Sequence, residues 1–186
     1  MRIISGKFKG KTINFLKNSK TRPLKDNVKE SIFNILNHSK YVEITLKNSN
    51  VLDLYSGVGS FGLECLSRDA KKVTFVERDK EASEILKKNL KLLSLLKKSL
   101  VLNTEIESFL QKDLQEKFNI FFFDPPFSDE KYVKNLALIK KSEIYDAKNI
   151  VIIHRDKKTE DKINNYIDIF FSKNYGRSKI ILGKFN

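Results

Sequence analysis

Cysteine, histidine and proline are all scarce in this sequence. The single cysteine, Cys65, excludes an internal disulfide, and the two histidines, His38 and His154, lie too far apart to suggest a zinc-ligand cluster. The longest apolar runs, such as that within residues 118–123, fall far short of a membrane span. The N-terminus, MRIISGKFKG, has no apolar signal core. We therefore expect a cytoplasmic protein that binds no metal and does not enter a membrane.

Positive charge, by contrast, is abundant. The chain has 36 lysines and arginines against 23 acidic residues, which gives a net charge of +13. This excess suggests a polyanionic partner, nucleic acid first, although widely spread lysines also suit an ordinary solvated surface. The N-terminal stretch is more specific, because no acid occurs among residues 1–25. Its basic residues include Arg2, Lys7, Lys9, Lys11, Lys17, Lys20 and Arg22.

The length of 186 residues indicates one α/β domain. After about residue 50, short apolar segments alternate with helical patterns, which predicts a parallel sheet with helices on both faces. Helices are predicted at 26–38, with Asp26 as N-cap, and at 79–98. The predicted strands are 50–55, 72–77, 99–104, 119–124, 149–154, 167–171 and 178–185, with a turn at 174–176 between the last two. Residues 1–20 read as a basic extension, able to pair as a hairpin through Gly6 and Gly10, and residues 21–186 as the core.

A glycine-rich loop follows the first predicted strand. Gly57, Gly59 and Gly62 form G-x-G-x-x-G, a pattern that is weak alone because dinucleotide-binding folds share it. Here Asp53 precedes the loop, where a carboxylate would repel a pyrophosphate and attract a cation. S-adenosylmethionine (SAM) carries a sulfonium and an amino group and no phosphate, and glycines let the backbone approach it closely. The loop therefore favours SAM.

Acidic residues also follow the next two strands. Glu77 could accept both hydrogen bonds from a ribose diol, and Glu105 could accept one from an adenine amino group. Either alone would suit a solvated strand end, but with Asp53 and the glycines in this order they predict a cofactor site at the carboxyl ends of the strands. The predicted SAM site comprises Asp53, Tyr55, Ser56, Gly57, Gly59, Glu77, Arg78, Glu105, Ile106 and Asp124.

The segment FFFDPPF at 121–127 closes the fourth predicted strand. Pro125 and Pro126 fix φ and lack N–H donors, so the backbone after Asp124 is stiff and presents carbonyls. Such a loop suits a substrate group that donates two hydrogens, as the exocyclic amino group of a nucleobase does. The Asp124 side chain and the Pro125 carbonyl would each accept one N–H, and Phe127 would stack on the base once it has left its own stack.

Five segments together resemble a known family: MRIISGKFKGKTI, TRPLKDNVKESIFNIL, VLDLYSGVGSFGLECLSRDA, TFVERD and FFFDPPF. In this order they are similar to the bacterial small-subunit (16S) ribosomal RNA guanine-N2 methyltransferases. The resemblance covers nearly the whole chain and is strongest at 2–36, 51–79 and 119–127. Many amino-directed methyltransferases share the glycine loop and D-P-P-F, whereas the two N-terminal segments are more specific.

The resemblance implies a Rossmann-like seven-stranded sheet of order 3-2-1-4-5-7-6 with its last strand antiparallel. It implies methyl transfer from SAM to a guanine 2-amino group of 16S rRNA in the small subunit or its precursor, by a protein expected to be a monomer. The implied catalytic residues are Asp124, Pro125, Pro126 and Phe127. Arg22, Pro23 and Asp26 match an R-P-x-x-D segment near the active site. The predicted RNA contacts are Arg2, Lys7, Lys9, Lys11, Arg22 and Asp26.

Three departures from the family pattern are visible. Leu24 and Asn27 replace hydroxyl and basic residues beside Asp26, and Glu105 stands where a smaller polar residue is common. The fifth strand ends in His154–Arg155 where a carboxylate is more usual. We interpret His154 as a half-exposed strand end.

Two other functions are compatible with parts of the sequence. D-P-P-F alone permits an adenine-N6 methyltransferase acting on DNA or RNA, but a large target-recognition insertion would then be expected. A non-catalytic RNA-binding assembly factor on the same fold is the other alternative, and the intact Asp53, Gly57 and Asp124 argue against it.

Overall fold

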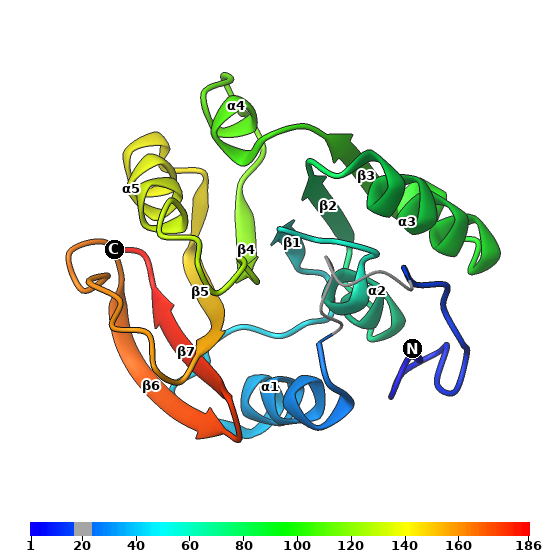
Figure 1. Cartoon of the computed structure of the whole chain (residues 1–186), viewed down its shortest axis with the longest axis horizontal. Helices are drawn as coiled ribbons and strands as arrows, with labels where there is room; N and C mark the ends of the chain where they lie inside the picture. The colour runs from blue at the N-terminus through cyan, green and yellow to red at the C-terminus, as the bar shows by residue number, and fades with distance from the viewer. Residues whose placement is uncertain (17–23) are drawn as a thin grey trace.

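A single seven-stranded sheet forms the centre of the structure (Figure 1), a computed structural model that describes residues 1–16 and 24–186. The strand order is β3-β2-β1-β4-β5-β7-β6. The neighbouring pairs from β3 to β5 are parallel, and β7 is antiparallel to both β5 and β6. The predicted order and the antiparallel last strand are therefore confirmed. The strands are β1 (Asn50–Leu54), β2 (Lys72–Glu77), β3 (Ser99–Asn103), β4 (Phe118–Phe123), β5 (Tyr145–Asp156), β6 (Asp168–Tyr175) and β7 (Ser178–Lys184).

Helices cover both faces of the sheet, as the alternating pattern predicted (Figure 1). On one face lie α1 (Asp26–His38), α2 (Ser60–Ser67) and α3 (Lys80–Leu92), and on the other lie α4 (Ile106–Leu110) and α5 (Tyr132–Ser142). Successive strand residues supply opposite cores: Val51 and Phe122 pack under α1 and α2, while Leu52 and Phe123 pack under α4 and α5. By the same alternation, Asp53 and Asp124 belong to the α2 side of the sheet.

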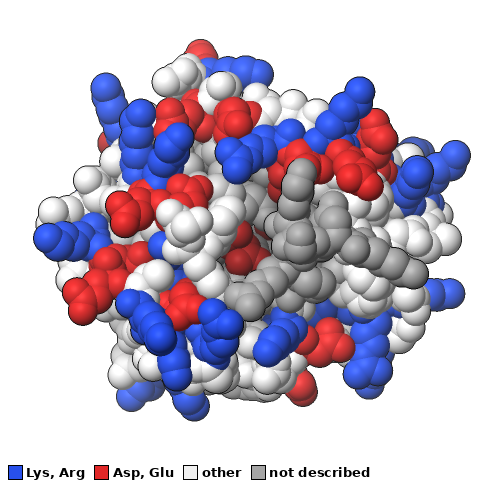
Figure 2. Space-filling view, viewed as in Figure 1, with Lys and Arg blue, Asp and Glu red and all other residues white. Residues whose placement is uncertain are grey.

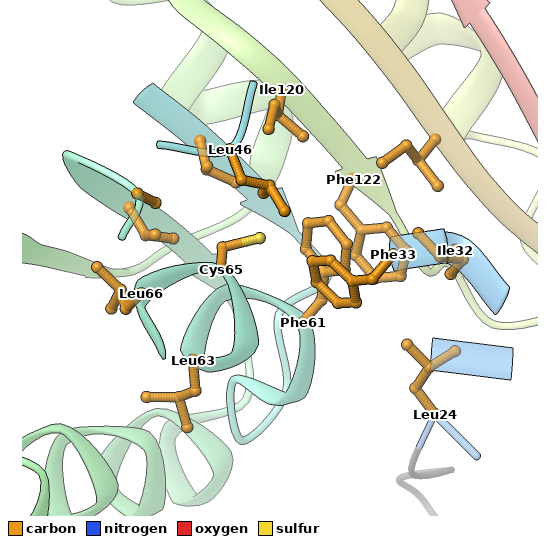
Figure 3. Packing of buried hydrophobic residues seen from close by; sticks show 14 of the residues in the cluster. Leu24, Ile32, Phe33, Leu46, Phe61, Leu63, Cys65, Leu66, Ile120 and Phe122 are labelled. Atoms are coloured by element: carbon orange, nitrogen blue, oxygen red, sulfur yellow. The ribbon is translucent and has the colours of Figure 1, made fainter. Parts of the chain in front are cut away.

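A stack of three aromatic rings fastens α1 and α2 to the sheet (Figure 3). The Phe61 ring of α2 lies 4.0 Å from the Phe122 ring of β4 and 5.3 Å from the Phe33 ring of α1, measured between centroids. All three side chains are buried. Stacked aromatic pairs add about 0.5–1.5 kcal/mol each beyond the area that they bury. The stack therefore fixes the start of α2, and with it the loop that precedes this helix.

The N-terminal segment packs onto α2 through buried polar groups. Glu64 accepts hydrogen bonds from the backbone N–H groups of Ile4 and Ser5, each at 2.9 Å. An antiparallel bridge joins Arg2 to Thr12, so residues 1–13 pair through the turns at Gly6 and Gly10. Only glycine suits position 6, where φ is +78° and a Cβ would lie 2.0 Å from the carbonyl oxygen of Ser67. The predicted pairing through Gly6 and Gly10 is thus present within residues 1–13, whereas residues 17–20 of the predicted extension lie outside the described residues.

Two local predictions were wrong. Asp26 is the first residue of α1 and not its N-cap: Lys25 holds the cap position, and no side chain caps this end. The Asp26 carboxylate is instead paired with Arg2 at 3.1 Å. The helix predicted over 79–98 ends at Leu92, because Ser94 adopts a φ of +56° that a helix cannot continue through, and a separate 3₁₀ turn, Leu96–Lys98, follows.

Candidate active site

The ends of β1, β2 and β4 bring three acidic residues together, because these strands are adjacent and parallel. Asp53 lies near the end of β1, Glu77 ends β2, and Asp124 follows directly after β4. The charges of Asp124 and Glu77 both act on Asp53. Adjacent carboxyl ends of parallel strands are the usual location of ligand sites in open α/β sheets. The structure thus groups the carboxylates that sequence spacing predicted.

One carboxylate oxygen of Asp53 has a hydrogen-bond donor among the described residues, and the other has none. Its Oδ2 accepts a 2.9 Å hydrogen bond from the N–H of Gly62, but Oδ1 is buried without a hydrogen-bond partner among the described residues. Burial raises the pKa of Asp53 well above its ordinary value, the Gly62 hydrogen bond lowers it, and Asp124 and Glu77 raise it further. A cation or an N–H donor placed beside Oδ1 would relieve this burial cost.

The glycine loop turns sharply between β1 and α2. Gly57 and Gly59 adopt φ of +53° and +88°, which favours glycine, and no atom of the described residues lies within 4 Å of a Cβ built on Gly57. The Glu77 carboxylate fixes the loop by accepting 2.7 Å and 2.8 Å hydrogen bonds from the N–H groups of Gly57 and Asp79. Glu77 therefore organises the loop, and the hydrogen bonds to a ribose that the sequence suggested for it remain a prediction.

A pocket opens beside this loop. Its polar lining includes Asp53 and Asp124, together with Ser56 and Ser60, whose hydroxyls are buried without a partner among the described residues. Figure 2 shows acidic side chains in a hollow near the middle of one face, with basic and acidic side chains intermixed toward the edge of that face. The pocket is lined by Met1, Phe15, Leu16, Leu24, Asp53, Tyr55, Ser56, Gly57, Val58, Ser60, Phe61, Phe122 and Asp124.

Five predicted cofactor residues lie outside this lining: Gly59, Glu77, Arg78, Glu105 and Ile106. Arg78 and Glu105 are exposed and form an ion pair at 3.6 Å between the ends of β2 and β3, and Ile106 is buried as the first residue of α4. Tyr55 lines the pocket, and its hydroxyl accepts a 3.0 Å hydrogen bond from Asn135 of α5. Burial raises the pKa of Tyr55, so that its hydroxyl stays protonated at neutral pH. The cofactor roles of Arg78, Glu105 and Ile106 remain predictions.

The D-P-P-F loop is anchored by a side chain of β5, a contact that the sequence did not predict. Arg155 is 2% exposed and donates from its guanidinium to the carbonyl oxygens of Pro126 and Phe127, at 3.0 and 3.2 Å. The same guanidinium bonds to Asp161 at 3.2 Å and lies over the Tyr132 ring at 4.6 Å. The loop is therefore stiffened by this guanidinium as well as by its prolines.

His154 also contacts this loop, and its interpretation as a half-exposed strand end was wrong. The residue is 8% exposed, and its Nδ1 lies 2.8 Å from Oδ1 of Asp124. Its Nε2 lies 2.8 Å from the hydroxyl of Ser178 on β7. The residue is buried because β7 pairs along this part of β5. The only signal in the sequence was the departure from the family pattern at His154–Arg155.

Four of the predicted RNA-contacting residues lie on the N-terminal segment, and their RNA contacts remain predictions. Arg2 pairs with Asp26, and Lys7 pairs with Asp69 beyond α2. Lys9 and Lys11 are exposed. Arg22 and its neighbour Pro23 lie outside the described residues, so their placement near the active site stays a prediction.

The described residues contain neither a metal-binding cluster nor a membrane-spanning helix. Among residues 1–16 and 24–186, no group of three or more His, Cys, Asp and Glu side chains could hold a metal ion. Over the same residues, no helix is long and apolar enough to cross a membrane.

The pocket residues fit SAM. The unpartnered Oδ1 of Asp53 suits the positive charge of this cofactor, and the open space in front of Gly57 permits a close approach to the backbone. The strand order, the acidic β1 end and the glycine loop define the class of SAM-dependent methyltransferases with a Rossmann-like sheet.

Comparison with known proteins identifies the family. Residues 1–184 match the family model described as Conserved hypothetical protein 95. The ribosomal RNA small subunit methyltransferase D of Haemophilus influenzae is 35% identical over 159 residues, which cover 84% of this chain and 79% of that protein. The protein of the same name from Buchnera aphidicola is 32% identical over 156 residues, or 84% of this chain and 78% of that one. The chain therefore belongs to the family of these methyltransferases.

The solved structures agree with this placement. The structure of yhhF from Escherichia coli superposes with a TM-score of 0.85 at 26% identity, and the match covers 100% of this chain and 98% of that one.

Proposed function

We propose that this protein transfers the methyl group of SAM to the 2-amino group of a guanine in 16S rRNA. The main support for the proposal is that Asp53 and Asp124 line the same pocket, and that a rigid proline loop follows Asp124. Relatives named ribosomal RNA small subunit methyltransferase D support ribosomal RNA as the substrate. The net charge of +13 is consistent with an RNA partner.

Bound SAM supplies an electrophilic methyl group on a sulfonium. Asp53 holds the positive charge of the cofactor, and the glycine loop lets its backbone lie against the ligand. Asp124 accepts one hydrogen bond from the guanine amino group, through Oδ2, because Oδ1 is occupied by His154. The carbonyl of Pro125 accepts the other. The two acceptors raise the electron density on a nitrogen that is otherwise a poor nucleophile, and they hold it in line for attack.

Arg155 and Phe127 also contribute to the proposed reaction. Arg155 holds the carbonyls that follow Pro125, so the acceptor loop needs little reorganisation when the base enters. Phe127 follows the two prolines and supplies a ring on which an unstacked base can lie. No strong base is required, because the methylated nitrogen loses its proton readily.

The test is transfer of labelled methyl from SAM to small ribosomal subunits, or to their RNA, isolated from cells that lack this protein. Digestion of the product to nucleosides should give N2-methylguanosine. Asp124→Ala should abolish turnover while SAM affinity, measured by calorimetry, stays within a few-fold of wild type. Label recovered as N6-methyladenosine would support the adenine-directed alternative, and a pure protein that binds no SAM would support the assembly-factor alternative.

A further inference from the structure

We propose that His154 is a positioning residue that fixes the carboxylate of Asp124, and that Ser178 fixes the tautomer of His154. This inference rests on the proposed function, because it takes Asp124 as the group that contacts the substrate. It assigns a role in turnover to two residues on β5 and β7 that lie outside the pocket lining.

The geometry is a continuous hydrogen-bonded chain across three strands. Asp124 follows β4, His154 lies on β5 and Ser178 begins β7, and the two links of the chain are both 2.8 Å. The imidazole is 8% exposed, and the Phe127 ring meets it edge-on with 5.8 Å between centroids. The imidazole is therefore bonded at both nitrogens and packed against an aromatic ring, and it cannot turn without breaking one of these contacts.

The chemistry of the three groups determines the direction of each hydrogen bond. An ionised carboxylate only accepts, so Nδ1 of His154 must carry a hydrogen and donate it to Oδ1 of Asp124. In a neutral imidazole, Nε2 is then the acceptor, and the Ser178 hydroxyl is the donor that it needs. Ser178 thereby favours the tautomer that presents a donor to Asp124.

The consequence is an oriented carboxylate. The side chain of Asp124 is 23% exposed, so without a fixed partner it could rotate toward water. A donor on Oδ1 holds the plane of the carboxylate and keeps Oδ2 available to the substrate amino group. Misplacing a reacting group by about 1 Å can cost on the order of 100-fold in rate, so removal of His154 should reduce turnover strongly.

Two substitutions of His154 separate positioning from packing. His154→Phe keeps a ring of similar size and removes the donor, whereas His154→Asn is smaller but places an amide N–H near the position of Nδ1. We expect His154→Phe to lower kcat by roughly 10- to 100-fold with SAM affinity within about 3-fold of wild type. His154→Asn should recover most of this loss, although it fills the site less well.

Ser178 provides an independent test. Ser178→Ala should lower kcat by a few-fold, and the double variant Ser178→Ala with His154→Phe should be no slower than His154→Phe alone, because Ser178 acts only through His154. Turnover would be measured with SAM and small subunits from cells lacking this protein, with thermal unfolding as the control for folding.

Several outcomes would overturn the proposal. These are a wild-type kcat in His154→Phe and a His154→Asn variant as slow as His154→Phe. A third is a double variant whose loss of kcat equals the product of the losses in Ser178→Ala and His154→Phe. If His154→Phe does not fold, an unchanged kcat in Ser178→Ala is decisive against the proposal. Label on a base other than guanine would refute the proposed function, while the ranking of the variants on that base would still decide the role of His154.

Discussion

Replacement of Arg155 by methionine tests whether β5 holds the active-site loop. The guanidinium is 2% exposed and makes three hydrogen bonds, to Asp161 and to the carbonyls of Pro126 and Phe127. Removing one partner of a buried ion pair typically costs about 3–5 kcal/mol. Asp161 keeps Lys179 at 3.4 Å and the hydroxyl of Thr159 at 3.0 Å, which places the expected cost toward the lower end.

The assay is thermal unfolding, followed by turnover below the transition. For a chain of this length, about 3–5 kcal/mol corresponds to a fall in Tm of roughly 6–20 °C. Methyl transfer by folded Arg155→Met should fall by more than about 10-fold, because the acceptor loop is no longer anchored. SAM affinity should change little, since Arg155 does not line the pocket.

Arg177→Met is the matched control. Arg177 pairs with Asp156 at 3.4 Å, but its side chain is 72% exposed, so the loss should be below about 1 kcal/mol. Arg155→Lys should retain the charge but not the fork that reaches two carbonyls, and should lie between Arg155→Met and wild type. The reasoning is refuted if Arg155→Met unfolds within 2 °C of Arg177→Met and turns over at the wild-type rate.

Three further predictions concern the cofactor and the N-terminal segment. Because the pKa of Asp53 is raised, the ligand-free protein should lose stability as the pH rises through that pKa. SAM affinity should rise over the same pH range, because the cation binds the ionised carboxylate. SAM binding should therefore release a proton, which calorimetry in buffers of different ionisation heat can measure. Gly6→Ala should destabilise the protein by about 2 kcal/mol or more in urea unfolding, because the positive φ of Gly6 and its contact with a backbone carbonyl of α2 both exclude a Cβ. An unchanged unfolding midpoint would contradict the packing of the N-terminal segment on α2. Changing Lys7, Lys9 and Lys11 together to Glu should weaken RNA binding and flatten its salt dependence without altering SAM affinity, and an unchanged RNA affinity would exclude an N-terminal contribution.

Local sequence patterns were sufficient to predict much of the sheet and the grouping of Asp53 with the glycine loop. Strands such as 50–54 and 72–77 are short, apolar and bounded by polar residues, so their period and position are visible in the chain. Asp53 and the glycines lie within one strand and the loop that follows it, so their spacing in the sequence is enough to predict that they are neighbours in the structure. The strand order came from the family resemblance, which the structure and the comparisons confirm.

The missed residues depend on long-range pairing. His154 lies 30 residues from Asp124 and 24 from Ser178, and only the antiparallel return of β7 buries it. Asp26 was predicted to be an N-cap because a short polar side chain begins an amphipathic helix. In the structure it forms an ion pair with Arg2, which lies 24 residues earlier in the N-terminal segment. No local window of sequence contains these partners.

Two adjacent residues of β5, His154 and Arg155, hold the loop after β4 from opposite sides of the sheet. Successive residues of a strand point to opposite faces, so His154 lies on the side of Asp53 and α2, while Arg155 faces Tyr132 of α5. One holds the carboxylate of Asp124, and the other holds the carbonyls two and three residues later. The Asp124 carboxylate and the backbone that follows Pro125 are therefore both bonded to β5, and a shift of β5 relative to β4 would disturb them together. Hence variants that loosen the pairing of β7 with β5 should lower turnover before they lower SAM affinity, since Asp53 and Gly57, which we propose to hold the cofactor, belong to β1 and its loop.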